Sequence, residues 1–283
     1  MDVQHFQPQS ELLRQHIEYY YFLRTDDPGF QTEYYAFPNL LISLNLHANV
    51  AVDIKDHSIA VSGGERYENR VAIVQGLRRQ PLKVSLSGTI DKITIVFKPL
   101  GLAAFVKKTV AKICSCDSQM FTEWDEIVDY QQFLPRFFQA VDQMERIDLL
   151  ERFLLSRHQP VEEHSRLRKA MGSLTDFQTE RSVEEVAAQI GINVRTFSRL
   201  FKENVGISPA GFKKIARFRH SLNNKMFSDN FERLTDVAYD SNFYDQSYFI
   251  NIYKQMTGSN PKRFFDRVEK VGAEKLLFQF LDR

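Results

Sequence analysis

The chain has 283 residues, with 43% hydrophobic and 26% charged side chains and a net charge of +1. This length and composition are typical of one or two globular domains and exclude a disordered or fibrous chain. Apolar runs fall short of the ~20 residues of a membrane-spanning helix, and the N-terminus lacks the basic-then-apolar pattern of a signal peptide. We therefore expect a cytoplasmic protein that makes no membrane contact.

The positive charge is concentrated in one segment near the C-terminus. Residues 191–270 contain 14 Lys and Arg against 8 Asp and Glu, a net charge of +6, whereas residues 1–160 carry a net charge of −3. A basic segment inside a nearly neutral chain is the charge pattern of a nucleic-acid-binding region. The distribution therefore favours a polyanionic partner for the C-terminal half.

Residues 17–100 alternate short runs of β-branched and aromatic residues with polar turn sequences. Seven runs predict strands: 17–23, 33–37, 40–46, 50–54, 71–77, 82–86 and 93–97. The turns between them include DDPG at 26–29, SGGERYEN at 62–69 and SGTID at 87–91. Seven short strands joined by polar turns predict an antiparallel β-barrel or sandwich.

The pattern becomes helical after Leu100, which makes the predicted fold class α+β. Helices are expected from LAAFVKKTV onwards, then over about 121–139 and 144–157. Segment 147–157 has a broad apolar face, and two uses for it remain open: covering the barrel, or contacting a second copy in a homodimer. Residues 158–161 read as a linker, so we predict domains at 1–160 and 162–283, the second one all-helical.

The two cysteines and the histidines give no sign of a metal or catalytic site. Cys114 and Cys116 are too close for an easy disulfide, which leaves two ordinary thiols or, as the alternative, a redox sensor. His47 and His57 lack the close His-x-His spacing of barrel metal sites, so neither metal nor cofactor is expected. Because no P-loop, nucleophile elbow or dinucleotide fingerprint occurs, the sequence does not predict an enzyme.

A helix-turn-helix unit is predicted at about 183–204. Ser182-Val-Glu-Glu185 is a capping box, which starts a helix at 183, and Gly191 ends it. Residues 192–194 form the turn, and a second helix follows with Phe197, Leu200 and Phe201 expected to point inward. Its outer row is polar and basic: Arg195, Ser198, Arg199 and Lys202. A helix, a glycine turn and a short helix with a polar outer row are typical of DNA-binding units.

The same pattern returns and predicts a second unit at about 234–257. Phe249, Ile252 and Tyr253 repeat the three inward residues of the first unit at a spacing of 52. The stripe of its first helix is Leu234, Val237 and Ala238, and Asn242 takes the place of Gly191. A basic helix over about 209–228 would hold the two units apart, with Lys213, Lys214, Arg217 and Arg219 on it.

Residues 163–268 resemble the DNA-binding domain of AraC/XylS-type transcription regulators, and FYDQSYFINIYKQMTGSNPKRF is similar to the signature of the second unit. The resemblance implies two recognition helices in successive major-groove segments of double-stranded DNA. It implies base contacts from Arg195, Thr196, Ser198, Arg199, Gln246, Ser247, Ile250 and Asn251. Lys202 and Lys254 are expected to contact phosphates, because an ammonium meets a phosphate more naturally than a base edge.

Three positions of the second unit depart from the family pattern. Asn242 replaces the usual glycine, and Asn251 stands where arginine is common. Ile250 is an apolar residue on a helix face that should be exposed to water. Ile250 would meet thymine methyl groups, or the second unit would contribute mainly phosphate contacts; both readings stay open.

The N-terminal half, through VQGLRRQPLKVSL and FKPLGLAAF, resembles a cupin-like barrel-plus-helices domain found before such regulators. The resemblance implies effector binding or dimerisation, and RNA polymerase as a partner. We therefore predict a sequence-specific transcription regulator, which the resemblance implies is an activator. A small-molecule effector and a second copy in a homodimer are among its expected partners. The alternatives are a barrel-domain enzyme with an appended helical DNA-binding module, and an architectural DNA binder with weak sequence preference.

Overall fold

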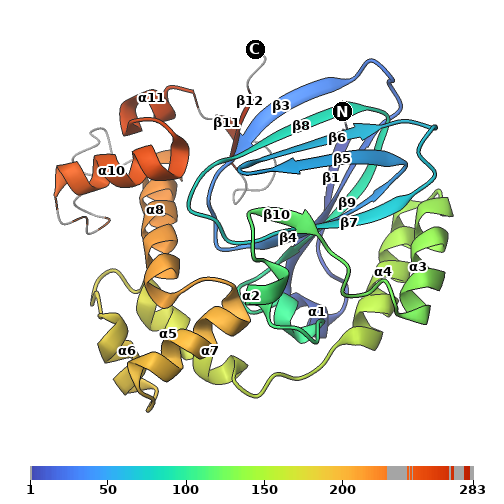
Figure 1. The fold of residues 1–283 in the computed structure, drawn as a ribbon. Helices are drawn as coiled ribbons and strands as arrows, with labels where there is room; N and C mark the ends of the chain where they lie inside the picture. The colour runs from blue at the N-terminus through green and yellow to red at the C-terminus, as the bar shows by residue number, and fades with distance from the viewer. Residues whose placement is uncertain are drawn as a thin grey trace.

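The computed structural model describes residues 2–227, 241, 243, 245–267, 269–270 and 277–280. Two β-sheets face each other in the N-terminal part, and a group of helices lies beside them (Figure 1). None of the helices described is both long and apolar enough to cross a membrane. The α+β class and the sandwich are confirmed, but the two sheets do not close into a barrel.

Within the described residues each sheet has six strands, so the seven predicted strands are part of a larger set. The first sheet runs in the order β1 (Asp2–Phe6), β2 (Ile17–Thr25), β9 (Ile90–Phe97), β4 (Ile42–Ala48), β7 (Arg70–Gln75), β10 (Ser118–Met120). The second runs β11 (Glu269–Lys270), β12 (Leu277–Phe280), β3 (Gln31–Ala36), β8 (Leu82–Gly88), β6 (Ser58–Gly63), β5 (Val50–Lys55).

The predicted antiparallel pairing is confirmed with one exception among the described strands. β6 and β8 are parallel, because the chain between them passes through β7 in the opposite sheet and returns in the same direction. β6 itself begins four residues before the predicted turn at 62–69 and overlaps it. At its end Gly63 lies against Gly88, and a Cβ on Gly63 would come within 1.7 Å of the Thr89 carbonyl oxygen. Only glycine allows that approach.

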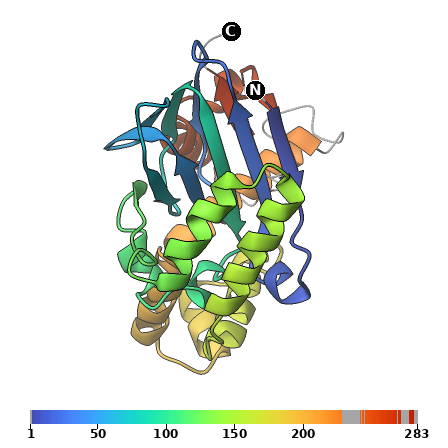
Figure 2. The same cartoon turned by 90° about the vertical axis from the view of Figure 1, so that its right-hand side faces the viewer.

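α3 (Val128–Gln139) and α4 (Gln143–Arg157) cover the outer face of the first sheet, as Figure 2 shows. The shorter elements α1 (Glu11–Arg14), the 3₁₀ turn Leu102–Ala104 and α2 (Val110–Ile113) contribute to the same core. The predicted helix at 121–139 begins only at Val128, because Trp124 before it is buried in a turn and donates its indole N–H to the Phe105 carbonyl at 3.1 Å.

The apolar face of α4 covers the sheet, which is one of the two uses that the sequence left open. Ile147, Leu150, Phe153 and Leu154 are at most 5% exposed and belong to the same core as Phe97 of β9. The helix is also tied to the sheet by charge, since Arg146 donates two hydrogen bonds to the Asp91 carboxylate, at 2.7 and 2.9 Å. The apolar face of α4 is therefore buried within one chain.

The remaining helices form the C-terminal part. They are α5 (His164–Thr175), α6 (Val183–Gln189), α7 (Val194–Val205), α8 (Pro209–Phe227), α10 (Gln246–Thr257) and α11 (Pro261–Phe265). The prediction that everything after residue 162 is helical is wrong at the C-terminus, because β11 and β12 are strands and β12 pairs antiparallel with β3. The free edge of β3 offers unpaired backbone groups, which a following segment can satisfy.

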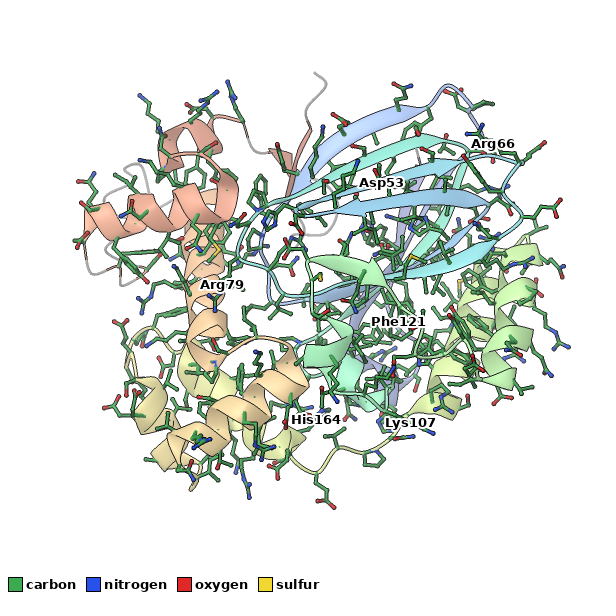
Figure 3. The ribbon with its side chains drawn as sticks, viewed as in Figure 1. Asp53, Arg66, Arg79, Lys107, Phe121 and His164 are labelled. Atoms are coloured by element: carbon green, nitrogen blue, oxygen red, sulfur yellow. The ribbon has the colours of Figure 1, made fainter. Side chains whose placement is uncertain are left out.

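Contacts between the two parts are apolar and polar. Phe37, which follows β3, belongs to the helical core and meets the Phe264 ring edge-on at a centroid distance of 4.9 Å. Arg79, labelled beside α8 in Figure 3, reaches the Ser208 hydroxyl at 3.5 Å. The domain limits 1–160 and 162–283 stay a prediction, but Phe37 shows that the helical core includes a residue from the first of these ranges.

Candidate nucleic-acid interface

The first predicted unit is built by local capping. Ser182 accepts a hydrogen bond from the Glu185 backbone N–H at 3.1 Å, and the Glu185 carboxylate accepts one from the Ser182 N–H at 2.6 Å. This reciprocal pair satisfies two of the free N–H groups at the start of α6. Gly191 follows with φ of +73°, the left-handed conformation that ends a helix and suits glycine.

α7 starts one residue earlier than the predicted turn allows, at Val194. Asn193 is the reason, because its side-chain oxygen accepts a hydrogen bond from the Thr196 N–H at 2.8 Å and so caps the helix. Phe197 and Phe201 are fully buried as predicted, but Leu200 is only half-buried. The helix is thus held by two aromatic residues one turn apart.

The outer face of α7 carries the predicted basic row. Arg195, Arg199 and Lys202 are exposed, and their spacing of four and three residues places them on one stripe of the helix. Thr196 and Ser198 are half-buried beside that stripe. Arg199 already has an ion-pair partner, since its Nη1 atom lies 3.0 Å from the Glu203 carboxylate one turn further on. A DNA contact by Arg199 would replace this exposed ion pair.

α10 is the described half of the second unit. The Asp245 carboxylate caps it by accepting a hydrogen bond from the Tyr248 N–H at 2.7 Å, and Gly258 ends it with φ of +74°. Phe249 and Tyr253 are buried, as expected for the aromatic stripe. Its exposed residues include Gln246, Ser247, Asn251 and Lys254. Ile250 is half-buried and packs against the helical core, so only part of its side chain faces outward.

The first helix of the second unit lies outside the described residues. Leu234, Val237, Ala238 and Asn242 therefore stay predictions, as does the limit of the unit at residue 234. Phe243, just before α10, is described and buried against the Phe249 ring at a centroid distance of 5.0 Å.

α8 connects the two units and is anchored to both of them. Its 19 residues span about 28 Å at 1.5 Å per residue, which is close to the ~34 Å of one DNA turn. Lys213 donates to the Arg181 carbonyl at 2.8 Å, and Arg217 forms an ion pair with Glu180, which fixes α8 to the segment before α6. Ser221 exchanges a hydrogen bond with the Tyr253 hydroxyl at 3.0 Å, which fixes α8 to α10. The spacer is therefore a rigid rod between two anchored helices.

Sequence reasoning missed one feature of α8, namely the place of Arg219. It was counted with the basic residues of the spacer, but its side chain helps to line a cavity in the N-terminal sandwich. Burial lowers its pKa to about 10. Lys92 lines the same cavity. In the sequence it stands out as a charged residue within the strand-like run IDKITIVF, on the strand face that it shares with Ile90 and Thr94.

α6, the glycine turn and α7 have the arrangement of a helix-turn-helix unit, and both α7 and α10 present a polar outer face. Residues 186–267 match a family described as "Helix-turn-helix domain". Residues 4–115 match a family described as "Domain of unknown function (DUF6597)".

Curated relatives match part of the chain. A stretch of 99 residues is 29% identical to the HTH-type transcriptional activator RhaS of Klebsiella pneumoniae, over 35% of each chain. A stretch of 126 residues is 26% identical to the arabinose operon regulatory protein of Escherichia coli, over 42% of each chain. The match thus spans less than half the length of these relatives. The resemblance of the C-terminal segment to AraC-type regulators is confirmed by these matches.

Solved structures of ToxT from Vibrio cholerae are also similar to this chain. One aligns with a TM-score of 0.44 at 11% sequence identity, over 87% of this chain and 98% of its own. Another aligns with a TM-score of 0.41 at 13% identity, over 87% of this chain and 97% of its own.

Proposed function

We propose that this protein is a sequence-specific, DNA-binding transcription regulator. The observation that carries the proposal is the pair of capped helices, α7 and α10, that expose polar and basic residues and are joined by the anchored rod α8. A rigid spacer of about one DNA turn would let both helices enter the major groove on one side of the duplex.

Base contacts are assigned by position on the exposed faces. In α7 they are Arg195, Thr196, Ser198 and Arg199, and in α10 they are Gln246, Ser247, Ile250 and Asn251. Arginine pairs with guanine O6 and N7, amide side chains pair with adenine, and the outward part of Ile250 would meet a thymine methyl group. Lys202 and Lys254, both exposed, would hold phosphates and set the register.

The N-terminal sandwich would respond to a small-molecule effector and pass the signal to α8. A homodimer belongs to the same proposal, but it needs a surface other than the apolar face of α4, which the sheet already covers. RNA polymerase is the partner that the activator relatives suggest. Sedimentation of the full chain at micromolar concentration should give a dimer. A monomer at that concentration would contradict the proposed homodimer.

The test of the main proposal is to select bound sequences from a random pool of double-stranded DNA with the full-length protein. The selected site should bind at least 10³-fold more tightly than random DNA, about the lower end for specific recognition. Affinity should fall steeply with salt, with a slope of about −0.9 for each phosphate neutralised. Binding with the same salt slope but no preference for any sequence would instead identify an architectural binder.

A further inference from the structure

Two buried hydroxyl groups meet where the C-terminal half of α8 lies against α10 (Figure 1). Ser221 of α8 and Tyr253 of α10 are both fully buried, and their side-chain oxygens lie 3.0 Å apart. The surroundings are aromatic, since the Tyr253 ring meets three phenylalanine rings at centroid distances of 5.1, 4.7 and 5.8 Å: Phe218, Phe249 and Phe264. The pair is therefore a polar contact enclosed by the apolar core of the helical part.

The direction of this hydrogen bond follows from the other partner of Ser221. The Ser221 hydroxyl has one proton and donates it to the Phe218 carbonyl at 2.8 Å. Tyr253 is therefore the donor of the shared bond, and the Ser221 oxygen is the acceptor. Burial raises the pKa of Tyr253, so its phenol keeps the proton that it donates. Both hydroxyl groups are satisfied, as polar groups inside a core usually are.

The first helix-turn-helix unit has an aromatic ring without a hydroxyl at the matching position. Phe201 precedes Tyr253 by 52 residues, the spacing at which the two units repeat. It is also fully buried, and it meets the Phe212 ring of α8 edge-on at a centroid distance of 5.3 Å. A ring of the same size therefore fills the core in both units, and the Tyr253 hydroxyl supplies something that filling the core does not require.

A hydrogen bond restricts the position of α10 in a way that apolar packing does not. Burial of apolar surface has no preferred direction, whereas two hydroxyl groups are bonded only at about 2.5–3.0 Å between oxygens, with the proton aimed at its acceptor. If α10 rotated, or slid along α8 by the roughly 1.5 Å of one residue, a buried hydroxyl would lose its partner, which is costly. Buried polar residues fix the register of packed helices in coiled coils for the same reason.

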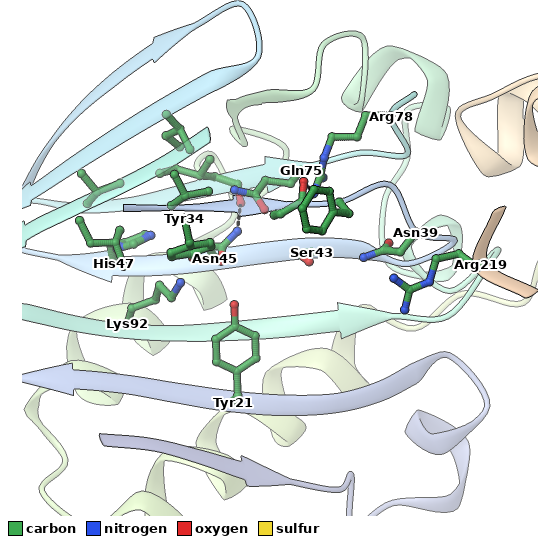
Figure 4. Close-up of a pocket in the computed structure, with 17 residues that line it drawn as sticks. Tyr21, Tyr34, Asn39, Ser43, Asn45, His47, Gln75, Arg78, Lys92 and Arg219 are labelled. Atoms are coloured by element: carbon green, nitrogen blue, oxygen red, sulfur yellow. Dashed lines mark hydrogen bonds between the residues drawn. The ribbon is translucent and has the colours of Figure 1, made fainter. Parts of the chain in front are cut away.

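α8 is itself held in place, so the bond fixes α10 relative to the rest of the molecule. Lys213 and Arg217 tie α8 to the segment before α6. Arg219 lies two residues before Ser221, and so on the opposite side of the helix, where it lines the cavity in the sandwich (right-hand side of Figure 4). Loss of the contact between Ser221 and Tyr253 would therefore free α10 and leave α7 in place.

We propose that the hydrogen bond from Tyr253 to Ser221 is the positioning contact that decides which separation of the two DNA segments the protein accepts. The inference rests on the proposed function, in which α7 and α10 enter two segments of the major groove. Neither hydroxyl touches DNA, because both are enclosed in the core. Each base pair inserted between the segments displaces one of them by about 3.4 Å and rotates it by about 35°. α10 can follow such a change only by breaking its bond to α8.

Two other polar contacts of α8 with the second unit restrict α10 less. Lys214 donates to the Gln255 side chain at 2.7 Å, but this contact is exposed, so water can replace either partner. Asn224 donates to the Ser241 hydroxyl at 3.4 Å, a long contact that joins α8 to the segment before α10. Gln255→Ala removes an exposed bond between the same two helices without a change of charge, and it is therefore the matched control.

The experiment measures equilibrium affinities of the full-length protein for three DNA duplexes. They are the selected site and two derivatives, with one base pair inserted or removed between its two motif blocks. The unaltered protein should bind both derivatives at least about tenfold more weakly, a loss comparable to that from one mismatched base pair. Tyr253→Phe keeps every base-contacting side chain, so it should bind the selected site within about threefold of the unaltered protein. Its discrimination against the derivatives should fall below about threefold, whereas Gln255→Ala should keep the full discrimination.

Ser221→Ala removes the other half of the bond and tests the same contact independently. It leaves the Tyr253 hydroxyl without its acceptor, whereas in Tyr253→Phe the Ser221 hydroxyl keeps its bond to the Phe218 carbonyl. Ser221→Ala should therefore be the less stable of the two variants. Both variants and the double variant S221A/Y253F should lose the same discrimination, because one contact cannot be removed twice. Circular dichroism confirms that each variant is folded before DNA is added.

The possible outcomes separate this inference from the proposed function. Discrimination that survives in folded Tyr253→Phe would overturn the inference, as would a loss of affinity that is equal on all three duplexes, or losses of discrimination that add in the double variant. Specific binding by the unaltered protein that ignores the separation of the blocks would overturn the inference alone. Absence of any preference for a selected sequence would overturn the proposed function, and the inference with it.

Discussion

Arg199 is the residue whose substitution best distinguishes a base contact from a phosphate contact. In the structure its guanidinium is ion-paired with Glu203, an exposed contact that contributes little and can be exchanged for a guanine. Arg199→Ala should therefore reduce affinity for the selected site by the ~1–3 kcal/mol of a bidentate base contact. Affinity for random DNA should fall much less. Equal losses on both kinds of DNA in equilibrium titrations would contradict a base-reading role.

Lys254 is the matched comparison on α10. It is exposed in the last turn of that helix, where an ammonium can meet a phosphate. Lys254→Ala should weaken binding to both kinds of DNA together and reduce the salt slope by about one phosphate. Circular dichroism should show that both variants stay folded, because exposed substitutions usually change stability by no more than about 0.5 kcal/mol.

The two cysteines differ in reactivity for a physical reason. Burial raises the pKa of Cys114 to about 12, and its Cβ fills the space next to Gly76, whereas Cys116 is exposed. Because the thiolate is the reactive form, a thiol reagent at pH 8 should modify Cys116 quickly and Cys114 only on unfolding. Counting modified thiols by mass spectrometry, with Cys116→Ser as the control, measures this. Rapid modification of two thiols in the folded protein would contradict it.

At the scale of elements, α7 depends on the cap that the sequence places just before it. The Asn193 side chain satisfies the Thr196 N–H, and without it that donor would rely on water. Asn193→Ala should lower the free energy of unfolding by about 1 kcal/mol and loosen the start of the helix that carries Arg195. Urea denaturation measures the loss. Asn223→Ala, at an exposed position of α8, is the control and should change stability little.

At the scale of the whole molecule, the helical part is predicted to work on its own. Most of its core comes from its own helices, and both recognition helices belong to it. A fragment of residues 162–283 should therefore fold and bind the selected site. It should melt below the full chain, because it loses Phe37 and the pairing of β12 with β3. A folded fragment with no more affinity for the site than for bulk DNA would contradict the domain assignment.

A histidine cluster joins the sandwich to the linker and to α5. The Nε2 atoms of His16 and His158 lie 3.1 Å apart, and the His164 ring is 6.1 Å from that of His16. Burial, with nearby positive charges such as Arg168, lowers the pKa values of His16 and His164 to about 4. These rings are neutral in the folded protein but take up protons near pH 6.5 once unfolded.

Stability should consequently be complete above about pH 7 and fall as the pH drops from 6.5 towards 4, because the unfolded chain then binds more protons. Melting curves between pH 7.5 and pH 5 would show this as a falling Tm. The Tm of the double variant H16N/H164N should fall less over the same pH range. Some loss of stability should remain in the double variant, because burial also lowers the pKa of His47. An unchanged pH dependence in the double variant would contradict the role of the cluster.

Local signals in the sequence determined the helix-turn-helix unit. A capping box, a glycine in the left-handed region and an aromatic stripe act through neighbours a few residues away, so Ser182, Gly191 and Phe197 could be placed without knowledge of the rest of the chain. The strand runs were equally readable, since alternation with polar turns is a local pattern.

Only the tertiary structure decided the features that depend on distant segments. The parallel pairing of β6 with β8, the addition of β12 to the edge of β3, and the use of the α4 face against the sheet each join residues far apart in sequence. The same holds for the cavity: Arg78 and Arg219 look like ordinary surface cations in the sequence, and they share one buried space with Lys92 only because α8 lies against the sandwich. Periodicity records which side of an element is buried, but it does not record which partner covers that side.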